Sequence, residues 1–252
     1  MKLDARLNLF ITLVAVFMTC LIVGDMIGGK LTSFELFGRE WVFSVGQLAF
    51  PVTFILTDIL NEFYGRTVVR RVTFIAFFMV GLTFGLIYLA AALPWAPFTL
   101  DPSWSGVGPK EFGVVFTQAT QIQIASMLAF LIGNLTDISV FFLIKKATGN
   151  RMLWLRATGS TAVSQLIDTI VISGIIWFGI SIRLGWPPVI VAPKVTFETY
   201  VTIVLTSYLI KLAAAIVVTP IIYGLHEVIE KKYRIEPAPA DVESAEIAGD
   251  TK

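Results

Sequence analysis

Charged side chains are scarce in this chain of 252 residues. Only 15% of the residues are charged, 56% are hydrophobic, and the mean hydropathy is +0.80. A soluble domain usually carries about 25% charged residues, so this composition excludes a soluble globular protein and predicts an integral membrane protein. The net charge of +1 says nothing about partners, because a membrane protein distributes its charges between two aqueous sides.

Cysteine and histidine occur once each. Cys20 lies in the first apolar stretch, which excludes a disulfide within the chain and a metal site built on thiolates. His226 follows the last apolar stretch, so we expect no histidine cluster inside a bilayer. The sequence also lacks the phosphate-binding pattern GxxxxGK[ST] and the zinc pattern HExxH. We therefore expect no enzyme activity, no cofactor, no metal and no nucleic-acid partner.

Six long apolar stretches fill most of the sequence. About 20 apolar residues suffice to cross a bilayer as a helix, so these stretches predict an all-α membrane protein with six transmembrane helices. The first has a basic start like that of a signal peptide, but its length favours a retained helix. Residues 1–230 should form this domain, and the Pro/Ala/acid-rich segment 231–252 should be a disordered cytoplasmic tail. The predicted helices are 7–27, 41–62, 70–93, 117–144, 158–182 and 199–225.

Basic residues are distributed unequally between the two predicted sides of the membrane. Twelve lie on the side of the termini and five on the other. Because Lys and Arg concentrate in cytoplasmic loops, both termini should be cytoplasmic and the protein should lie in the cell (inner or plasma) membrane. The longer connections 28–40 and 94–116 fall on the outer side. The first should lie on the surface or dip back into the membrane, and the second should be an ordered interfacial loop.

Carboxylates and amides interrupt the apolar stretches, which is costly unless they serve a polar interior. Asp58 and Glu62 are four residues apart and share one face of a helix. Two roles are open for Glu62. It either pairs with Arg66 one turn further on and anchors the helix end, or takes part in function. Asp58 is deeper and has no cation nearby in sequence, which favours a polar contact inside the bundle.

A second polar stripe lies on the fifth stretch. Ser160, Ser164 and Asp168 recur every four residues, with Gln165 beside them. Small hydroxyl residues often pack transmembrane helices together, but this does not account for a central aspartate. Lys211 is a cation well inside the last stretch, and Asp168 is its natural partner.

A third group, Asn134 and Asp137, lies on the fourth stretch. Asp137 belongs to the tetrapeptide LTDI at 135–138, which repeats the LTDI at 56–59. Transporters are often built from duplicated helical units, although four matching residues also arise by chance.

Two stretches resemble a known family. FPVTFILTDILNEFYGR at 50–66 and LWLRATGSTAVSQLIDTIVI at 153–172 are similar to the signature stretches of the vitamin-uptake-transporter-like family of queuosine precursor transporters. The resemblance implies a six-helix importer of 7-cyano-7-deazaguanine or 7-aminomethyl-7-deazaguanine for tRNA queuosine synthesis. It also implies a fold similar to the substrate-binding subunits of energy-coupling-factor transporters. The residues carried over are Asp58, Glu62, Tyr64, Gly65, Arg156, Ser164, Gln165 and Asp168.

The chemistry of these residue types suits a guanine-like base. A carboxylate accepts two N–H groups side by side, an amide can serve a carbonyl, and aromatic rings sandwich a flat ring. We expect Asp168 and Gln165 to hold the heterocycle, with Asp58 and Glu62 lining the same cavity or its inner gate. The predicted substrate-binding residues are Asp58, Glu62, Asn134, Asp137, Ser164, Gln165 and Asp168; the predicted structural or ion-pair residues are Lys211, Arg66 and Arg156; and the aromatic candidates are Phe50, Phe54, Phe63, Tyr64 and Trp177.

Two other functions stay open at this point. One is the substrate-binding subunit of an energy-coupling-factor transporter for another small vitamin, which needs separate ATPase and scaffold chains. The other is an intramembrane enzyme acting on a lipid, which would need clustered aspartates or a histidine–carboxylate pair. We expect a small-molecule substrate and contact with membrane lipid, and leave a homo-oligomer open. Energy coupling is open too, between protonation of Asp168 or Glu62 and facilitated diffusion.

Overall fold

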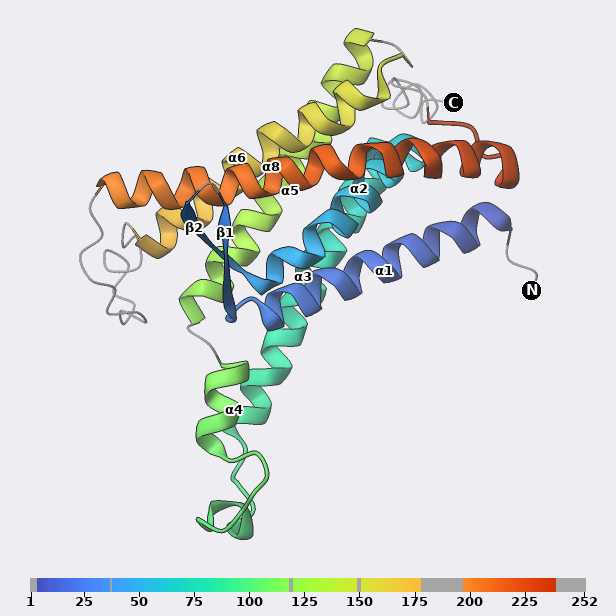
Figure 1. Ribbon diagram of the computed structural model, residues 1–252. Coiled ribbons are helices and arrows are strands. Elements are labelled where there is room, and N and C mark those ends of the chain that lie inside the picture. The colour runs from blue at the N-terminus through green and yellow to red at the C-terminus, as the bar shows by residue number, and fades with distance from the viewer. Residues whose placement is uncertain (1–3, 37, 118–119, 149–150, 178–196, 239–252) are drawn as a thin grey trace, which may run out of the picture.

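The computed structural model describes residues 4–36, 38–117, 120–148, 151–177 and 197–238 (Figure 1). These residues are mainly helical, as expected for an all-α membrane protein. Six helices have 15 residues or more within the described ranges, and successive ones run in opposite directions in Figure 1. They are α1 (Ala5–Ile27), α2 (Phe50–Tyr64), α3 (Arg66–Ala92), α5 (Thr120–Thr148), α6 (Leu153–Trp177) and α8 (Phe197–Val228).

Four of the described helices are long and apolar enough to cross a membrane, and they correspond to α1, α3, α5 and α8. Helix α6 has 25 residues but carries a stripe of polar side chains. Helix α2 has only 15 residues, which gives a length of about 22 Å, less than the roughly 30 Å of a hydrocarbon core. A short helix inside a bundle leaves one of its ends at membrane depth, where its backbone groups can line a cavity.

The predicted helix 41–62 is wrong in its first part. Strand β1 (Leu31–Leu36) pairs antiparallel with β2 (Arg39–Ser44), and the short helix η1 (Val45–Ala49) leads into α2. Phe34 faces Trp41 across the hairpin with their rings stacked, a pairing that stabilises strands. The Ser44 hydroxyl donates to the Gly28 carbonyl and accepts from the Gly46 N–H, which ends the strand at that residue.

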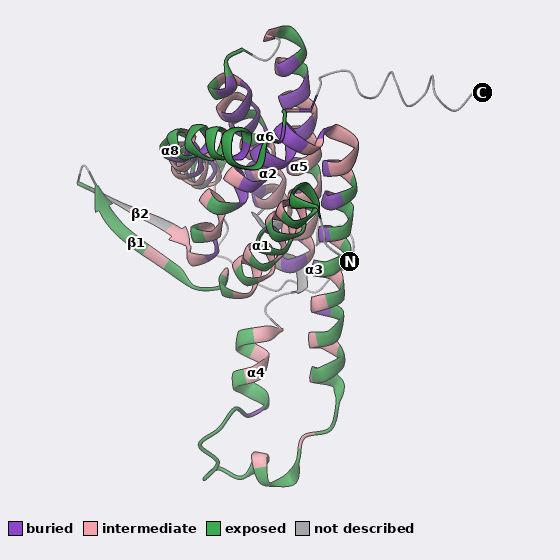
Figure 2. Cartoon of the chain, turned by 90° about the vertical axis from the view of Figure 1, so that its right-hand side faces the viewer, coloured by how far each residue is buried: buried purple, intermediate pink, exposed green. Residues whose placement is uncertain are grey.

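The segments expected as outer loops have regular structure. The hairpin replaces the predicted surface or re-entrant segment 28–40, and the predicted interfacial loop 94–116 contains η2 (Pro97–Leu100) and α4 (Pro109–Phe116). Both project from the bundle, and β1 and most residues between α3 and α4 are exposed (Figure 2). Helix α6 begins five residues before the predicted start at 158, and residues 178–182 of that prediction lie outside the described ranges.

The buried side chains gather where α2, α5 and α6 meet (Figure 2). Helices α5 and α6 pack along each other, and Gly133 allows this approach because a Cβ there would stand 3.1 Å from the Cβ of Asp168. One apolar cluster joins α2 to α6 and α8, and another joins α1, α2, α3 and α5. The core is thus built around the two helices that carry the resembling stretches.

The start of α1 and the end of α8 lie at the same end of the bundle in Figure 1. After α8, Arg234 adopts a left-handed backbone conformation that turns the chain back onto the helices. Ile235 and Ala238 are buried, and the Ala238 N–H donates to the Glu62 carbonyl at 2.7 Å. The packed part of the chain therefore extends past the predicted boundary at 230. Residues 239–252 of the predicted tail lie outside the described ranges.

Candidate transport site

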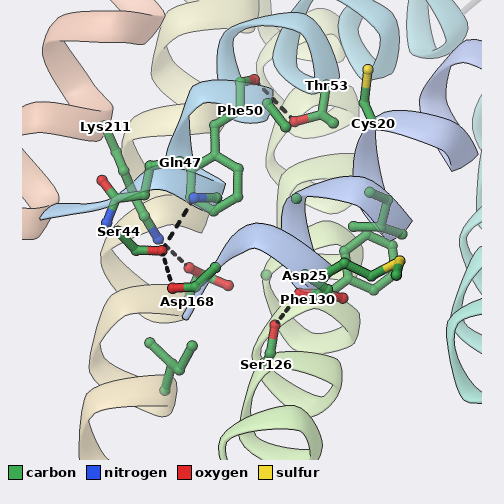
Figure 3. Close-up of a pocket in the computed structure, with 18 of the residues that line it drawn as sticks. Cys20, Asp25, Ser44, Gln47, Phe50, Thr53, Ser126, Phe130, Asp168 and Lys211 are labelled. Carbon is green, nitrogen blue, oxygen red and sulfur yellow. Dashed lines mark hydrogen bonds and ion pairs between the residues drawn. The ribbon is translucent and has the colours of Figure 1, made fainter. Parts of the chain in front are cut away.

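A cavity of about 590 Å³ lies among α1, α2, α5, α6 and α8, with Ser44 and η1 at its edge (Figure 3). This volume is in the range of pockets that enclose small organic ligands. Most of its lining is apolar, with a few polar groups from different helices. Six polar or charged residues singled out in the sequence line it together: Asn134, Asp137, Ser164, Gln165, Asp168 and Lys211.

One wall carries an ion pair. Lys211 Nζ of α8 lies 2.5 Å from Asp168 Oδ2 of α6, the pairing that the sequence favours. The two side chains are 5% and 14% exposed, so neither is surrounded by water. The same ammonium group sits 4.8 Å from the ring centre of Phe50, at the N-terminal end of α2. This contact fixes the aromatic ring beside the charged pair.

Two amide oxygens on the cavity are left without a partner. Gln165 Oε1 on α6 and Gln47 Oε1 in η1 are buried, and neither accepts a hydrogen bond. Such unpartnered acceptors are uncommon in proteins and call for an explanation, for which N–H donors of a ligand in the adjoining cavity are one candidate. Gln47 was not expected as a site residue, since it lay within an apolar stretch predicted to be a spanning helix.

Gln47 is positioned by a close contact between η1 and the end of α1. A Cβ on Gly46 would come within 2.4 Å of the Gly24 carbonyl oxygen and 2.9 Å of the Gly28 Cα, so only glycine fits there. The backbone of η1 therefore lies directly on α1, and the next residue reaches the cavity. The position of Gln47 thus follows from the glycine before it and not from the spacing of apolar residues.

The opposite wall comes from α1 and α5. Ser126 Oγ donates to Asp25 Oδ1 at 2.7 Å (Figure 3). Phe17 and Phe130 also line the cavity, and their ring centres are 6.3 Å apart. Asp25 is a further cavity carboxylate, which the sequence analysis did not weigh because it falls near a predicted helix end. Aromatic and apolar groups thus face the polar wall, as a flat ring would require.

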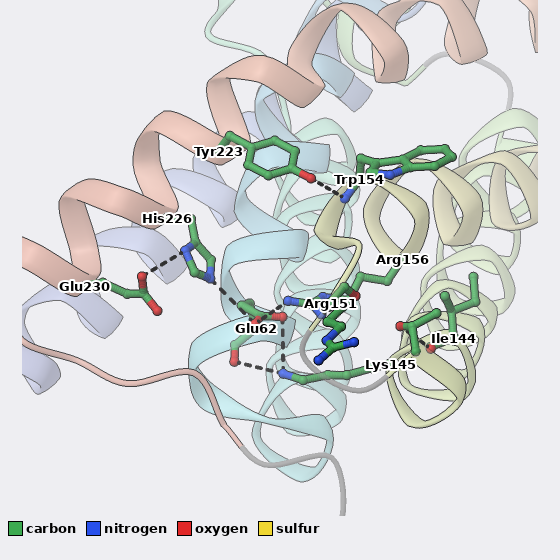
Figure 4. A network of polar contacts seen from close by, with 10 residues as sticks. Glu62, Ile144, Lys145, Arg151, Trp154, Arg156, Tyr223, His226 and Glu230 are labelled. Carbon is green, nitrogen blue, oxygen red and sulfur yellow. Dashed lines mark hydrogen bonds and ion pairs between the residues drawn. The ribbon is translucent and has the colours of Figure 1, made fainter.

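Glu62 lies outside the cavity, in a buried charge network at the end of α2 (Figure 4). Its carboxylate is 2.7 Å from Arg156 Nη2 on α6 and 3.2 Å from Lys145 Nζ on α5, and His226 Nε2 is 3.7 Å away. Lys145 and Arg156 are almost fully buried. The network ties α2, α5, α6 and α8 together at one end. Arg66 is the first residue of α3 at this end.

Asp58 and Asp137 lie between this network and the cavity. Asp137 accepts hydrogen bonds from Ser160 and Ser164 at 2.8 and 3.2 Å, and from Asn61 at 3.4 Å. Asp58 is 2% exposed, and its Oδ1 has no hydrogen-bond partner. Asp137 lines the cavity, whereas Asp58 does not.

The aromatic candidates divide in the same way. Phe50 and Phe54 line the cavity, and their ring centres are 5.9 Å apart. Phe63 and Tyr64 lie at the other end of α2, where Phe63 packs against the His226 ring. The Trp177 side chain lies outside what the structure describes. Among the described residues, no group of three or more His, Cys, Asp or Glu side chains is placed to hold a metal ion.

Comparison with known proteins connects this site to transport. Residues 44–225 match the profile of the family described as "Putative vitamin uptake transporter". The chain belongs to this vitamin uptake transporter family. The matched range contains the six polar cavity residues predicted from sequence, Gln47, and Glu62 with its partners Lys145 and Arg156.

A curated relative extends the match. This vitamin uptake transporter is 28% identical over 201 residues to the "Probable queuosine precursor transporter" of Bacillus subtilis (strain 168), covering 79% of this chain and 78% of the relative. No solved structure is significantly similar. The family and this relative are transporters, so the chain is a membrane transporter of a small molecule and not an enzyme.

Proposed function

We propose that this vitamin uptake transporter imports a queuosine precursor, 7-cyano-7-deazaguanine or 7-aminomethyl-7-deazaguanine. The observation that carries the proposal is the pair of buried, unpartnered amide oxygens of Gln47 and Gln165 beside the Asp168–Lys211 ion pair. The name of the Bacillus subtilis relative supports the same substrate class.

The cavity offers what the edge of a guanine-like base needs. Such a base presents N–H donors next to a carbonyl acceptor. Asp168 and the two glutamine oxygens accept the N–H groups, and the Lys211 ammonium donates to the carbonyl. Phe50 supplies a ring face at the same wall. Ser164, Asn134 and Asp137 line the deeper part of the cavity, where the hydroxyl and amide groups complete the contacts.

Transport also needs a closed path on one side. The Glu62 network lies beyond the cavity, at the end of the bundle where the start of α1 and the end of α8 are found. We assign this end to the cytoplasm and the hairpin and α4 to the outer side, in a protein with six membrane-spanning helices in the cell membrane. In this arrangement Glu62 acts as part of an inner gate, while Asp58 lies between the gate and the substrate.

Measurement of queuosine in tRNA tests the proposal. A host unable to make the precursor carries this gene and is fed each deazaguanine at nanomolar concentration. Queuosine should appear with the wild-type protein and fall at least tenfold with Gln165→Leu, which keeps the size of the side chain but removes the acceptor. Val163→Ala is the matched control, since Val163 is 43% exposed on the outer face of the same helix.

The competing outcomes are distinct. Absence of queuosine with either base, while the protein is present in the membrane, would overturn the substrate assignment. Import that appears only with separate ATPase and scaffold chains would identify a substrate-binding subunit of an energy-coupling-factor transporter. Full activity of Gln165→Leu would show that the Gln165 amide does not bind the substrate.

A further inference from the structure

Three buried carboxylates and two buried cations lie together between the cavity and the inner end of the bundle. The carboxylates are Asp58, Glu62 and Asp137, and the cations are Lys145 and Arg156. Both cations make their ion pairs with Glu62. When all three carboxylates are ionised and His226 is neutral, the group therefore carries one excess negative charge. Burial of such a charge is unfavourable, and one bound proton removes it.

The geometry identifies where the excess charge lies. Asn61 Nδ2 reaches Asp137 Oδ2 at 3.4 Å, and Asp58 is three residues before Asn61 on the same face of α2. Asp137 on α5 therefore faces the turn of α2 that carries Asp58. Hydrogen-bond donors satisfy Asp137, but none reaches Asp58 Oδ1. The ion pairs of Lys145 and Arg156 are both made with Glu62, and neighbouring carboxylates that have no ion pair of this kind share a proton readily.

We propose that Asp58 and Asp137 form one proton-binding site, and that proton entry at this site drives uptake. The inference rests on the proposed function, because it assigns the energy source of the same transport path. The sequence suggested Asp168 or Glu62 as the carboxylate that binds the coupled proton. The structure favours neither, because Asp168 is paired with Lys211 and Glu62 is paired with two cations.

The other charged groups around the pair have partners of their own. On α1, Asp25 accepts from Ser126; on α8, Lys211 is engaged by Asp168; and on α3, Arg66 and Arg70 make interactions. His226 of α8 is the remaining titratable side chain of the network. Its Nε2 lies 3.7 Å from Glu62 and its Nδ1 lies 3.5 Å from Glu230, so both ring nitrogens face glutamates.

The site is linked to the substrate cavity through Ser164. This hydroxyl donates to Asp137 Oδ1 at 3.2 Å, and both residues line the cavity. A base bound beside Ser164 and Gln165 changes the donors that Asp137 receives, and a proton on the pair changes the charge that the base meets. Substrate and proton thus influence each other's binding through one hydrogen bond. By linkage the effect is the same in both directions.

Purified full-length protein in proteoliposomes tests the inference, with labelled 7-cyano-7-deazaguanine as the probe and the membrane potential clamped at zero. With one proton per substrate, a gradient of one pH unit, acidic outside, should give about tenfold accumulation at steady state. A protonophore should abolish it. Asp58→Asn should exchange labelled for unlabelled substrate without a gradient, yet show no accumulation with one. Asp101→Asn, which changes a carboxylate in an exposed loop, is the control and should accumulate like wild type. His226→Gln tests separately whether the histidine carries the coupled proton.

Several results would overturn the inference. These are equilibration of the wild-type protein without accumulation, accumulation driven by a sodium gradient at equal pH, and gradient-driven accumulation by Asp58→Asn. Should Asp58→Asn fail to fold, Asp137→Asn provides the second variant, with the same expected loss of accumulation. If His226→Gln exchanged substrate but did not accumulate it, the coupled proton would be assigned to the histidine instead. Absence of both exchange and uptake by the wild-type protein would instead reject the substrate, so the two proposals fail in different ways.

Discussion

Replacement of Asp168 by asparagine removes the anion that faces Lys211 and leaves a buried ammonium group without its counter-charge. Removing one partner of a buried ion pair typically costs about 3–5 kcal/mol. Because Asp168 is 14% exposed and Lys211 lies over the Phe50 ring, we expect the lower end, about 3 kcal/mol. Lys211→Met removes the cation with little change in volume and should cost a similar amount, because the carboxylate is then buried alone.

The double variant, Asp168→Asn with Lys211→Met, tests whether the two charges stabilise the protein through their direct interaction. It leaves no unpaired charge, so its stability should return to within about 1 kcal/mol of the wild type, a coupling of the size seen for residues in contact. Stability would be measured by titrating the protein from detergent micelles into SDS and following helix content by circular dichroism. Additive losses in the double variant would refute a direct pair.

Transport provides the second readout of the same set. Uptake should be low in all three proteins, and the double variant should remain inactive even though it is stable, because Asp168 also accepts N–H groups of the substrate. Amounts of protein in the membrane would be matched before rates are compared. A stable double variant that imports at the wild-type rate would show that Asp168 only holds the helices together.

Three further predictions concern packing and charge outside the cavity. Glu62→Gln leaves two buried cations without their anion and should cost about 3 kcal/mol or more in the SDS titration; a loss below about 1 kcal/mol would mean that the network is open to water. Gly46→Ala forces a Cβ against the backbone of α1 and should cost about 1–3 kcal/mol, whereas Gly85→Ala, which meets no atom within 4 Å, should be neutral or stabilising by up to about 1 kcal/mol; equal effects would contradict the contact. In the outer loop, the Ser103 N–H and hydroxyl donate to Asp101 and hold the pKa of that carboxyl below its usual value. This contact stabilises the folded loop above the unfolded aspartate pKa, and the stabilisation is lost as pH falls through the lowered value; Ser103→Ala should raise the pKa in an NMR titration, and an unchanged value would be inconsistent with the hydroxyl contact.

The apolar stretches predicted most of the helices, because a run of about 20 apolar residues has few alternatives in a membrane protein. The exception is the segment 41–49, whose composition is as apolar as that of a helix. Its residues Trp41, Val42 and Phe43 pair with residues 32–34 of β1, and Ser44 then ends the strand. Hydropathy does not show whether an apolar segment such as 41–49 continues a long helix or forms a strand followed by a short helix.

The cavity stripe of α6 was predictable because four-residue spacing places Ser164 and Asp168 on one face, and Lys211 was the cation well inside a predicted helix. The partners of Glu62 were not predictable by spacing. Lys145 lies 83 residues away and looked like a basic loop residue, yet it is fully buried. Local periodicity identifies which face of a helix is polar, but the partner across the bundle depends on how the helices pack.

The final described residues have a practical consequence for handling this protein. Ile235 and Ala238 pack at the C-terminal end of α2, where the Ala238 N–H donates to the carbonyl of Glu62. A fluorescent reporter joined directly after Tyr233 would replace these residues and remove their contact with Glu62. A reporter joined beyond Ala238 would keep them, so the choice of fusion point decides whether a tagged protein retains the native packing around Glu62.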